Sequence, residues 1–148
     1  EMKFLDGTWL ENYIFSILFE HLQSNNYKVY KNLEFIKEKE TNKNKKFKID
    51  CIVLKEYQII GISCTTEKSI KLCKMKAFEV YYRTKQIGGT QTKNILVSFA
   101  KENTAKELQE ELAIDTGSDK SNILILGYKD FEPLISKEKF LNFINETK

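Results

Sequence analysis

The chain has 148 residues, of which 41% are hydrophobic and 30% are charged, with a formal net charge of +3 and a single proline. This length and balance suit one domain around one core and exclude a disordered or low-complexity chain. No apolar run is long enough to span a bilayer and the first residues do not resemble a signal peptide, so we expect a cytoplasmic protein without a membrane partner.

Few side chains in this sequence suit catalysis by histidine or cysteine. Cys51, Cys64 and Cys73 are an odd set without the spacing of a metal site, and they are predicted to be reduced, packed thiols. The only histidine is His21, so we do not expect a histidine-based triad or a two-histidine metal site. Any chemistry would therefore depend on carboxylates and lysines.

The first half of the chain has one helical pattern and three strand patterns. Apolar residues at helical spacing predict an amphipathic helix over 8–25, where Thr8 and Glu11 form a capping-box pattern. Strands are expected over 27–38, 47–54 and 58–65, with a lysine-rich turn at 39–46 and a turn at Glu56–Tyr57. The third of these strands contains an unbroken apolar run, which is typical of a central strand covered on both faces.

In the second half, helices and strands alternate. A helix is expected over 69–86, ended by Gly88–Gly89, with an apolar stripe made of Ile70, Met75, Phe78, Tyr82 and Ile87. The remaining predicted elements are a strand over 94–99, a helix over 103–113 capped by Asn103 or Thr104, a loop over 115–121, a strand over 122–126 and a helix over 136–144. This order predicts a single α/β domain over 1–148, with a central mixed five-stranded sheet flanked by helices on both faces.

Several short segments carry a resemblance to a known family. They are Gly7–Glu11, Lys48–Ile52, Ile62–Thr66, Ile87–Gly89 and Lys93–Ser98. In order and spacing they resemble motifs of the PD-(D/E)XK nuclease superfamily. Within it, they are most similar to the nuclease domain of CRISPR-associated nucleases that carry a CARF sensor domain and are activated by cyclic oligoadenylate. The resemblance covers roughly the first two-thirds of the chain and implies the restriction-endonuclease-like three-layer fold.

The resemblance also implies roles for individual residues. In this family an aspartate and a glutamate hold Mg²⁺ or Mn²⁺, a lysine orients the attacking water, and a glutamate on the first helix assists. Asp50 and Glu11 match the aspartate and the helix glutamate. Ser63 and Thr65 stand where the family has its second acid and its lysine, so the catalytic motif is incomplete. Glu67, Glu79, Lys68 and Lys76 are the neighbours that would have to substitute, with Glu67 as the candidate third metal ligand.

Simpler explanations remain open for each of these residues. Glu11 alone would complete a capping box, and Asp50 would pair with a lysine. Ser63 and Thr65 would be ordinary strand residues on the face opposite Cys64. Aromatic and basic residues at 81–83 would pack in the core rather than stack on bases, and Gly88–Gly89 would end a helix rather than approach a phosphate.

Two groups of lysines can neutralise phosphates or simply form solvated surface. The residues expected to contact nucleic acid, DNA or RNA, are Lys45, Lys46, Lys48, Lys68 and Lys71. We therefore predict a nuclease-like, nucleic-acid-interacting domain with a degenerate metal-dependent site, weakly active or inactive, in CRISPR-linked antiviral defence. The alternatives are an active Mg²⁺- or Mn²⁺-dependent endonuclease with a rearranged site, and a protein-interaction module. A homodimer is expected from the fold, and the family's sensor domain has no counterpart here, which leaves open whether the chain is part of a longer protein.

Overall fold

The computed structural model describes residues 8–22, 27–37, 45–117, 122–131 and 133–145. Its helices are α1 (Thr8–Leu22), α2 (Ile70–Gly88), α3 (Glu102–Thr116) and α4 (Pro133–Asn145), with short 3-10 turns η2 (Gly89–Gln91) and η4 (Tyr128–Phe131). Its strands are β1 (Tyr27–Lys37), β2 (Lys45–Lys55), β3 (Gln58–Cys64), β4 (Lys93–Val97) and β5 (Ile123–Leu126). None of the described helices is long and apolar enough to cross a membrane.

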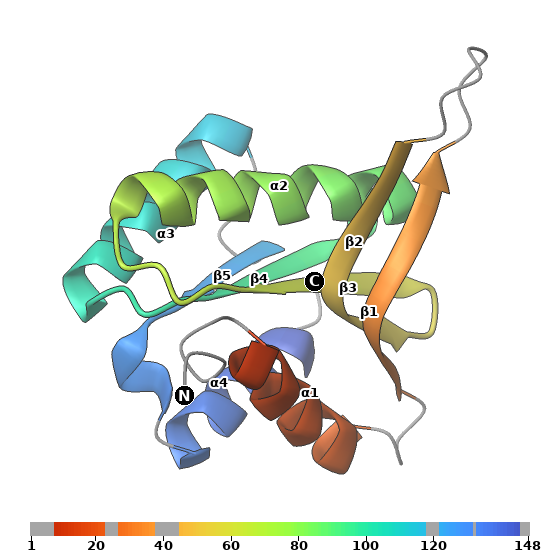
Figure 1. Cartoon of the computed structure of the whole chain (residues 1–148), viewed down its shortest axis with the longest axis horizontal. Coiled ribbons are helices and arrows are strands. Elements are labelled where there is room, and N and C mark those ends of the chain that lie inside the picture. The colour runs from red at the N-terminus through yellow and green to blue at the C-terminus, as the bar shows by residue number, and fades with distance from the viewer. Residues whose placement is uncertain (1–7, 23–26, 38–44, 118–121, 132, 146–148) are drawn as a thin grey trace.

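The five strands form one mixed sheet in the order β1-β2-β3-β4-β5. β1, β2 and β3 are antiparallel neighbours, whereas β3, β4 and β5 run parallel and are joined by helices. The helices α1 and α4 cover one face of the sheet and α2 and α3 cover the other (Figure 1). The predicted three-layer α/β fold with helices on both faces is therefore confirmed.

Local sequence patterns explain most of these elements. In α1 the buried residues repeat every fourth position as Leu10, Ile14, Leu18 and Leu22, and they pack on the core beneath the sheet. The apolar run of β3 lies at the centre of the sheet, as predicted, with Ile60–Ile62 buried. The three cysteines are buried free thiols.

The predicted apolar stripe of α2 is confirmed only in part. Its members Ile70, Phe78 and Ile87 pack against the core, whereas Met75 and Tyr82 are exposed. The helix buries Cys73, Ala77, Val80, Tyr81 and Thr84, and at Thr84 it approaches the sheet closely. A Cβ atom added at Gly61 of β3 would lie 2.0 Å from Thr84 Oγ1, so α2 can approach β3 this closely because residue 61 has no side chain.

The ends of the helices also refine the sequence-based expectations. The hydroxyl of Ser69 caps α2 by accepting a hydrogen bond from Leu72 N at 3.2 Å, and Gly89 ends it with φ of 74°, as the glycine pair indicated. The expectation that Asn103 or Thr104 caps α3 is wrong. The N-cap is Lys101, which makes no side-chain capping bond, because the helix begins one residue earlier than predicted.

The outer edge of β5 is closed by a side chain instead of another strand. Gln109 of α3 donates from Nε2 to Ile123 O at 2.7 Å and accepts at Oε1 from Ile125 N at 3.0 Å. Its amide thus satisfies one acceptor and one donor of this edge strand, which would otherwise be open to pairing with another chain.

Candidate active site

Asp50 lies where β2 and β3 stop pairing. Their antiparallel ladder ends at Cys51 opposite Ile62, and the carboxylate of Asp50 continues the pairing. Asp50 Oδ2 accepts hydrogen bonds from Cys64 N at 2.9 Å and from the Ser63 hydroxyl at 3.3 Å. A carboxylate in the middle of a strand is therefore accounted for by the hydrogen bonds that a strand end leaves unmade.

Glu11 of α1 also lies near Asp50, at this end of the β2–β3 ladder. It projects from the first turns of α1 and lies close enough to Asp50 for the charge of that carboxylate to act on it. The structure therefore brings together two acidic residues that are far apart in the sequence.

The environment of Glu11 favours its protonated form. Burial raises the pKa of Glu11 above its ordinary value, and the charge and hydrogen bond of Asp50 raise it further. The positive charges of Lys48 and Lys31 act in the opposite direction but do not cancel the rise. Lys31 was not singled out from the sequence. Its proximity follows from the register of the β1–β2 hairpin, which sets Lys31 opposite Cys51, next to Asp50.

Ser63 and Thr65 have different surroundings. Ser63 lies beside Asp50, within reach of its carboxylate, at the position expected from the resemblance. Thr65 is buried, and its hydroxyl accepts a hydrogen bond from Glu67 N at 3.2 Å, while its own N–H donates to Val97 O at 2.8 Å. Thr65 thus shapes the loop after β3, and Ser63 alone of these two contacts the acidic pair.

The neighbours considered as substitutes for the missing acid do not complete a metal cluster. Glu67 is exposed, and Glu79 on α2 forms an ion pair with Arg83 at 2.5 Å, on the opposite face of the sheet from α1. Within the described ranges, no group of three His, Cys, Asp or Glu side chains could hold a metal ion. The metal roles of Glu11, Asp50 and Glu67 remain predictions.

The donor set can nevertheless be compared with what a hard divalent cation needs. Mg²⁺ often keeps several waters and takes one or two protein carboxylates together with substrate phosphates. Glu11 and Asp50 meet this minimum, and the crowding of their charges is what a cation would relieve. The nearby thiols do not contribute, because burial raises the pKa of Cys51 to about 12 and that of Cys64 well above its ordinary value. The residues present fit a weak oxygen-ligated site.

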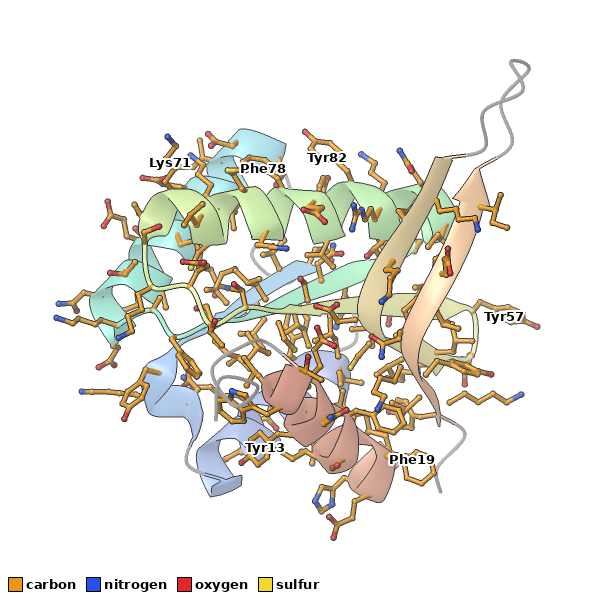
Figure 2. The ribbon with its side chains drawn as sticks, in the orientation of Figure 1. Tyr13, Phe19, Tyr57, Lys71, Phe78 and Tyr82 are labelled. Carbon is orange, nitrogen blue, oxygen red and sulfur yellow. The ribbon has the colours of Figure 1, made fainter. Side chains whose placement is uncertain are left out.

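The predicted nucleic-acid-binding lysines occupy two separate regions. The side chain of Lys45 is outside the described residues. Lys46 pairs with Glu34 at 3.8 Å on the β1–β2 hairpin, and Lys48 is close enough to Glu11 to affect its pKa. Lys68 is exposed in the loop after β3, whereas Lys71 projects from the outer side of α2, away from the sheet (Figure 2). Of these lysines, Lys48 is the one whose charge acts on Glu11 of the acidic pair.

No protein-family model matches the chain, and no curated protein matches its sequence. Solved structures do match. Protein VC1899 from Vibrio cholerae has a TM-score of 0.69 at 17% identity, over 93% of this chain and 34% of that protein. Can2 from Sulfobacillus thermosulfidooxidans, solved in complex with cyclic tetra-adenylate, has a TM-score of 0.67 at 16% identity, over 95% of this chain and 36% of Can2.

A protein of unknown function, AF1548, is a more distant match, with a TM-score of 0.50 at 15% identity over 83% of this chain and 59% of that protein. This chain spans about a third of the length of VC1899 and Can2. At these identities the likeness is one of fold, and the restriction-endonuclease-like fold expected from the sequence is confirmed.

Proposed function

We propose that this chain is a nuclease-like domain that binds nucleic acid beside the Glu11–Asp50 pair and cleaves it weakly or not at all. One observation supports the proposal above the others. The acids Glu11 and Asp50 lie together at the end of the β2–β3 ladder, and Ser63 stands beside Asp50 where the family has a further acid. This arrangement supports a phosphodiesterase site in which the second acid and the lysine are replaced.

The replacement of the second acid and the lysine should slow cleavage by an amount that can be approximated. A bound divalent cation supplies an activated water and offsets charge on the phosphate. In this chain Asp50 and Glu11 would hold it, and Ser63 adds only a neutral hydroxyl. Thr65 is buried and carries no charge, so it offers nothing to the developing negative charge. Loss of one preorganised electrostatic group typically slows a reaction by roughly 100- to 1,000-fold, and here both the acid and the lysine are replaced.

We also propose a cellular context from resemblance. The motifs resemble CRISPR-associated nucleases, and Can2, with the same fold, was solved with cyclic tetra-adenylate. A role in CRISPR-linked defence is therefore the context to test, with dimer formation as a further expectation. Because the chain spans about a third of Can2, the whole-protein activity of Can2 does not transfer directly.

The test is a cleavage and binding assay with single- and double-stranded DNA and RNA in the presence of Mn²⁺. We expect salt-dependent binding and cleavage close to background, since phosphate contacts release counterions whereas the catalytic motif is incomplete. Asp50→Asn is the matched variant, because the asparagine oxygen can still accept from Cys64 N. Rapid cleavage that Asp50→Asn abolishes would instead establish the active, rearranged endonuclease. Absence of salt-dependent binding to every oligonucleotide would refute the nucleic-acid role and favour a protein-interaction module.

A further inference from the structure

A surface pocket of about 630 Å³ lies beyond the carboxyl ends of β4 and β5, apart from the acidic pair. Its lining combines two aromatic rings with several basic side chains. The residues are Lys68, Phe99, Lys101, Glu102, Asn103, Tyr128 and Lys129. In sheets of this kind, ligands bind in the crevice outside the carboxyl ends of the parallel strands. The position and the chemistry of this pocket thus both suggest a ligand.

The aromatic rings are presented on firmly held backbone. The rings of Phe99 and Tyr128 are 6.3 Å apart between centroids and meet at 89°, so Phe99 supports the edge of Tyr128. Tyr128 N donates to Ala100 O at 2.8 Å and Phe99 N donates to Glu67 O at 3.2 Å, which ties the loops after β3, β4 and β5 together. Tyr128 is 65% exposed, so a large part of its ring is available to a planar ligand.

The charge around the rings is positive. Three lysines border the pocket against one carboxylate, that of Glu102, which pairs with Lys129 at 3.2 Å. Lys68 and Lys101 are exposed beside the rings. A flat apolar surface flanked by cations suits a ligand that is aromatic at one end and anionic at the other, and a nucleotide has this composition.

An aromatic contact links this pocket to α1, the helix that carries Glu11. The ring of Trp9, in the first turn of α1, packs on Phe99 with centroids 5.8 Å apart. Glu11 lies two residues further along the same helix, and Lys68 belongs to the loop that follows Ser63 out of β3. The pocket is therefore built on segments that adjoin those carrying the acidic pair and Ser63.

We propose that this pocket binds one nucleotide of a single-stranded nucleic acid, with its base stacked on Tyr128 and a phosphate between Lys68 and Lys101. The inference rests on the proposed function for the nature of its ligand. Single strands are favoured over duplexes because a base inside a duplex has both faces stacked on neighbours and cannot reach a side-chain ring. The 2′-hydroxyl is not read by any group named here, so DNA and RNA strands both fit.

The test is fluorescence anisotropy with labelled ten-nucleotide DNA and RNA strands, measured on the full chain over a range of salt concentrations. Tyr128→Ala should weaken binding by roughly tenfold, since loss of one base–aromatic stack has an effect of this size. The matched control is Tyr57→Ala, because Tyr57 is fully exposed at the β2–β3 turn, at the opposite end of β3 (Figure 2). Lys101→Ala should lower the slope of affinity against salt by about 0.7, as expected for one lost phosphate contact. The matched control is Lys28→Ala, which should lower the slope less, because Lys28 is an exposed lysine on β1 that does not line the pocket.

Each outcome decides a different point. Weaker binding by Tyr128→Ala, with Tyr57→Ala unchanged and thermal unfolding intact in both, supports the pocket. Strong binding by the native chain that Tyr128→Ala leaves unchanged overturns the pocket and leaves the proposed function standing. Equal affinity for duplex and single strand, or for adenosine monophosphate and the ten-nucleotide strand, overturns the single-strand assignment. Failure of the native chain to bind any oligonucleotide overturns both the pocket and the proposed function.

Discussion

Replacing Glu11 by glutamine should make the protein more stable in neutral and alkaline solution. The pKa of Glu11 is raised in the folded state, first by burial and then by the charge of Asp50, so the native protein favours its protonated form. The corresponding stabilisation is complete below the pKa of the unfolded chain and is lost as the pH rises through the raised folded value. Glutamine is neutral at every pH and keeps the shape of the protonated acid, so Glu11→Gln preserves that stabilisation.

The size of the effect follows from the electrostatics of the pair. Two like charges about 4 Å apart repel by about 1 kcal/mol in bulk water and by about 4 kcal/mol near a protein surface. Glu11 is only partly buried and Lys48 and Lys31 are nearby, so we take the lower part of this range. We expect Glu11→Gln to raise the free energy of unfolding by about 1–2 kcal/mol at about pH 8, and to leave it unchanged near pH 4.

Urea unfolding of the native chain and of Glu11→Gln at both pH values would measure this difference. The matched control is Glu20→Gln, because Glu20 is an exposed glutamate on the same helix and should show no such pH-dependent gain. A gain of the same size at both pH values would show that charge repulsion is not its cause. A loss of stability at about pH 8 would show that the charged form of Glu11 is not disfavoured in the folded protein, and would contradict this reasoning.

Three further predictions concern the same region and the packing behind it. Mn²⁺ at about 10 mM should stabilise the native chain by about 1.4 kcal/mol if it binds with a Kd near 1 mM; a thermal shift that persists in Asp50→Ala would place the cation elsewhere. Ser63→Glu alone should tighten Mn²⁺ binding roughly tenfold by titration calorimetry, whereas adding Thr65→Lys should cost about 1–3 kcal/mol because Thr65 is buried. If Ser63→Glu leaves Mn²⁺ binding unchanged, the alignment of β3 with the nuclease motif is wrong. Gly61→Ala should destabilise the chain by about 1–3 kcal/mol in urea unfolding, because its Cβ would meet Thr84 Oγ1 at 2.0 Å. Full tolerance of Gly61→Ala would contradict the tight contact of α2 with the sheet, and Thr84→Ala should recover part of the loss.

The two acidic residues of the candidate site could be chosen from the sequence, but the way they are brought together could not. Asp50 and Glu11 could be chosen from the sequence because a carboxylate in an apolar strand and a motif-like helix start are local signals. The proximity of the two carboxylates, the hydrogen bond from Cys64 N and the approach of Lys31 depend on where β2 and β3 diverge and on the hairpin register. No local pattern encodes that point, because it is set by pairing between separate strands.

The pocket at the carboxyl ends of β4 and β5 was not predicted at all. Phe99, Lys101 and Tyr128 lie in two loops without a repeated pattern, and only the parallel pairing of β4 with β5 brings those loops together. The apolar stripe of α2 was predicted in part for a related reason. Periodicity located Ile70, Phe78 and Ile87, which pack against the core, but it did not show that Thr84 meets Gly61 of β3 while Met75 and Tyr82 are exposed.

The sequence by itself determined the number, order and type of the helices and strands, and hence the layered α/β architecture. These features follow from hydrophobic periodicity and from glycines that end elements, which act over a few neighbouring residues. Only the tertiary structure decided which acids lie together, which residues of α2 are buried and which rings meet at the sheet edge. Those outcomes depend on contacts between residues far apart in the chain, and their distances are set by the packing of whole elements against one another.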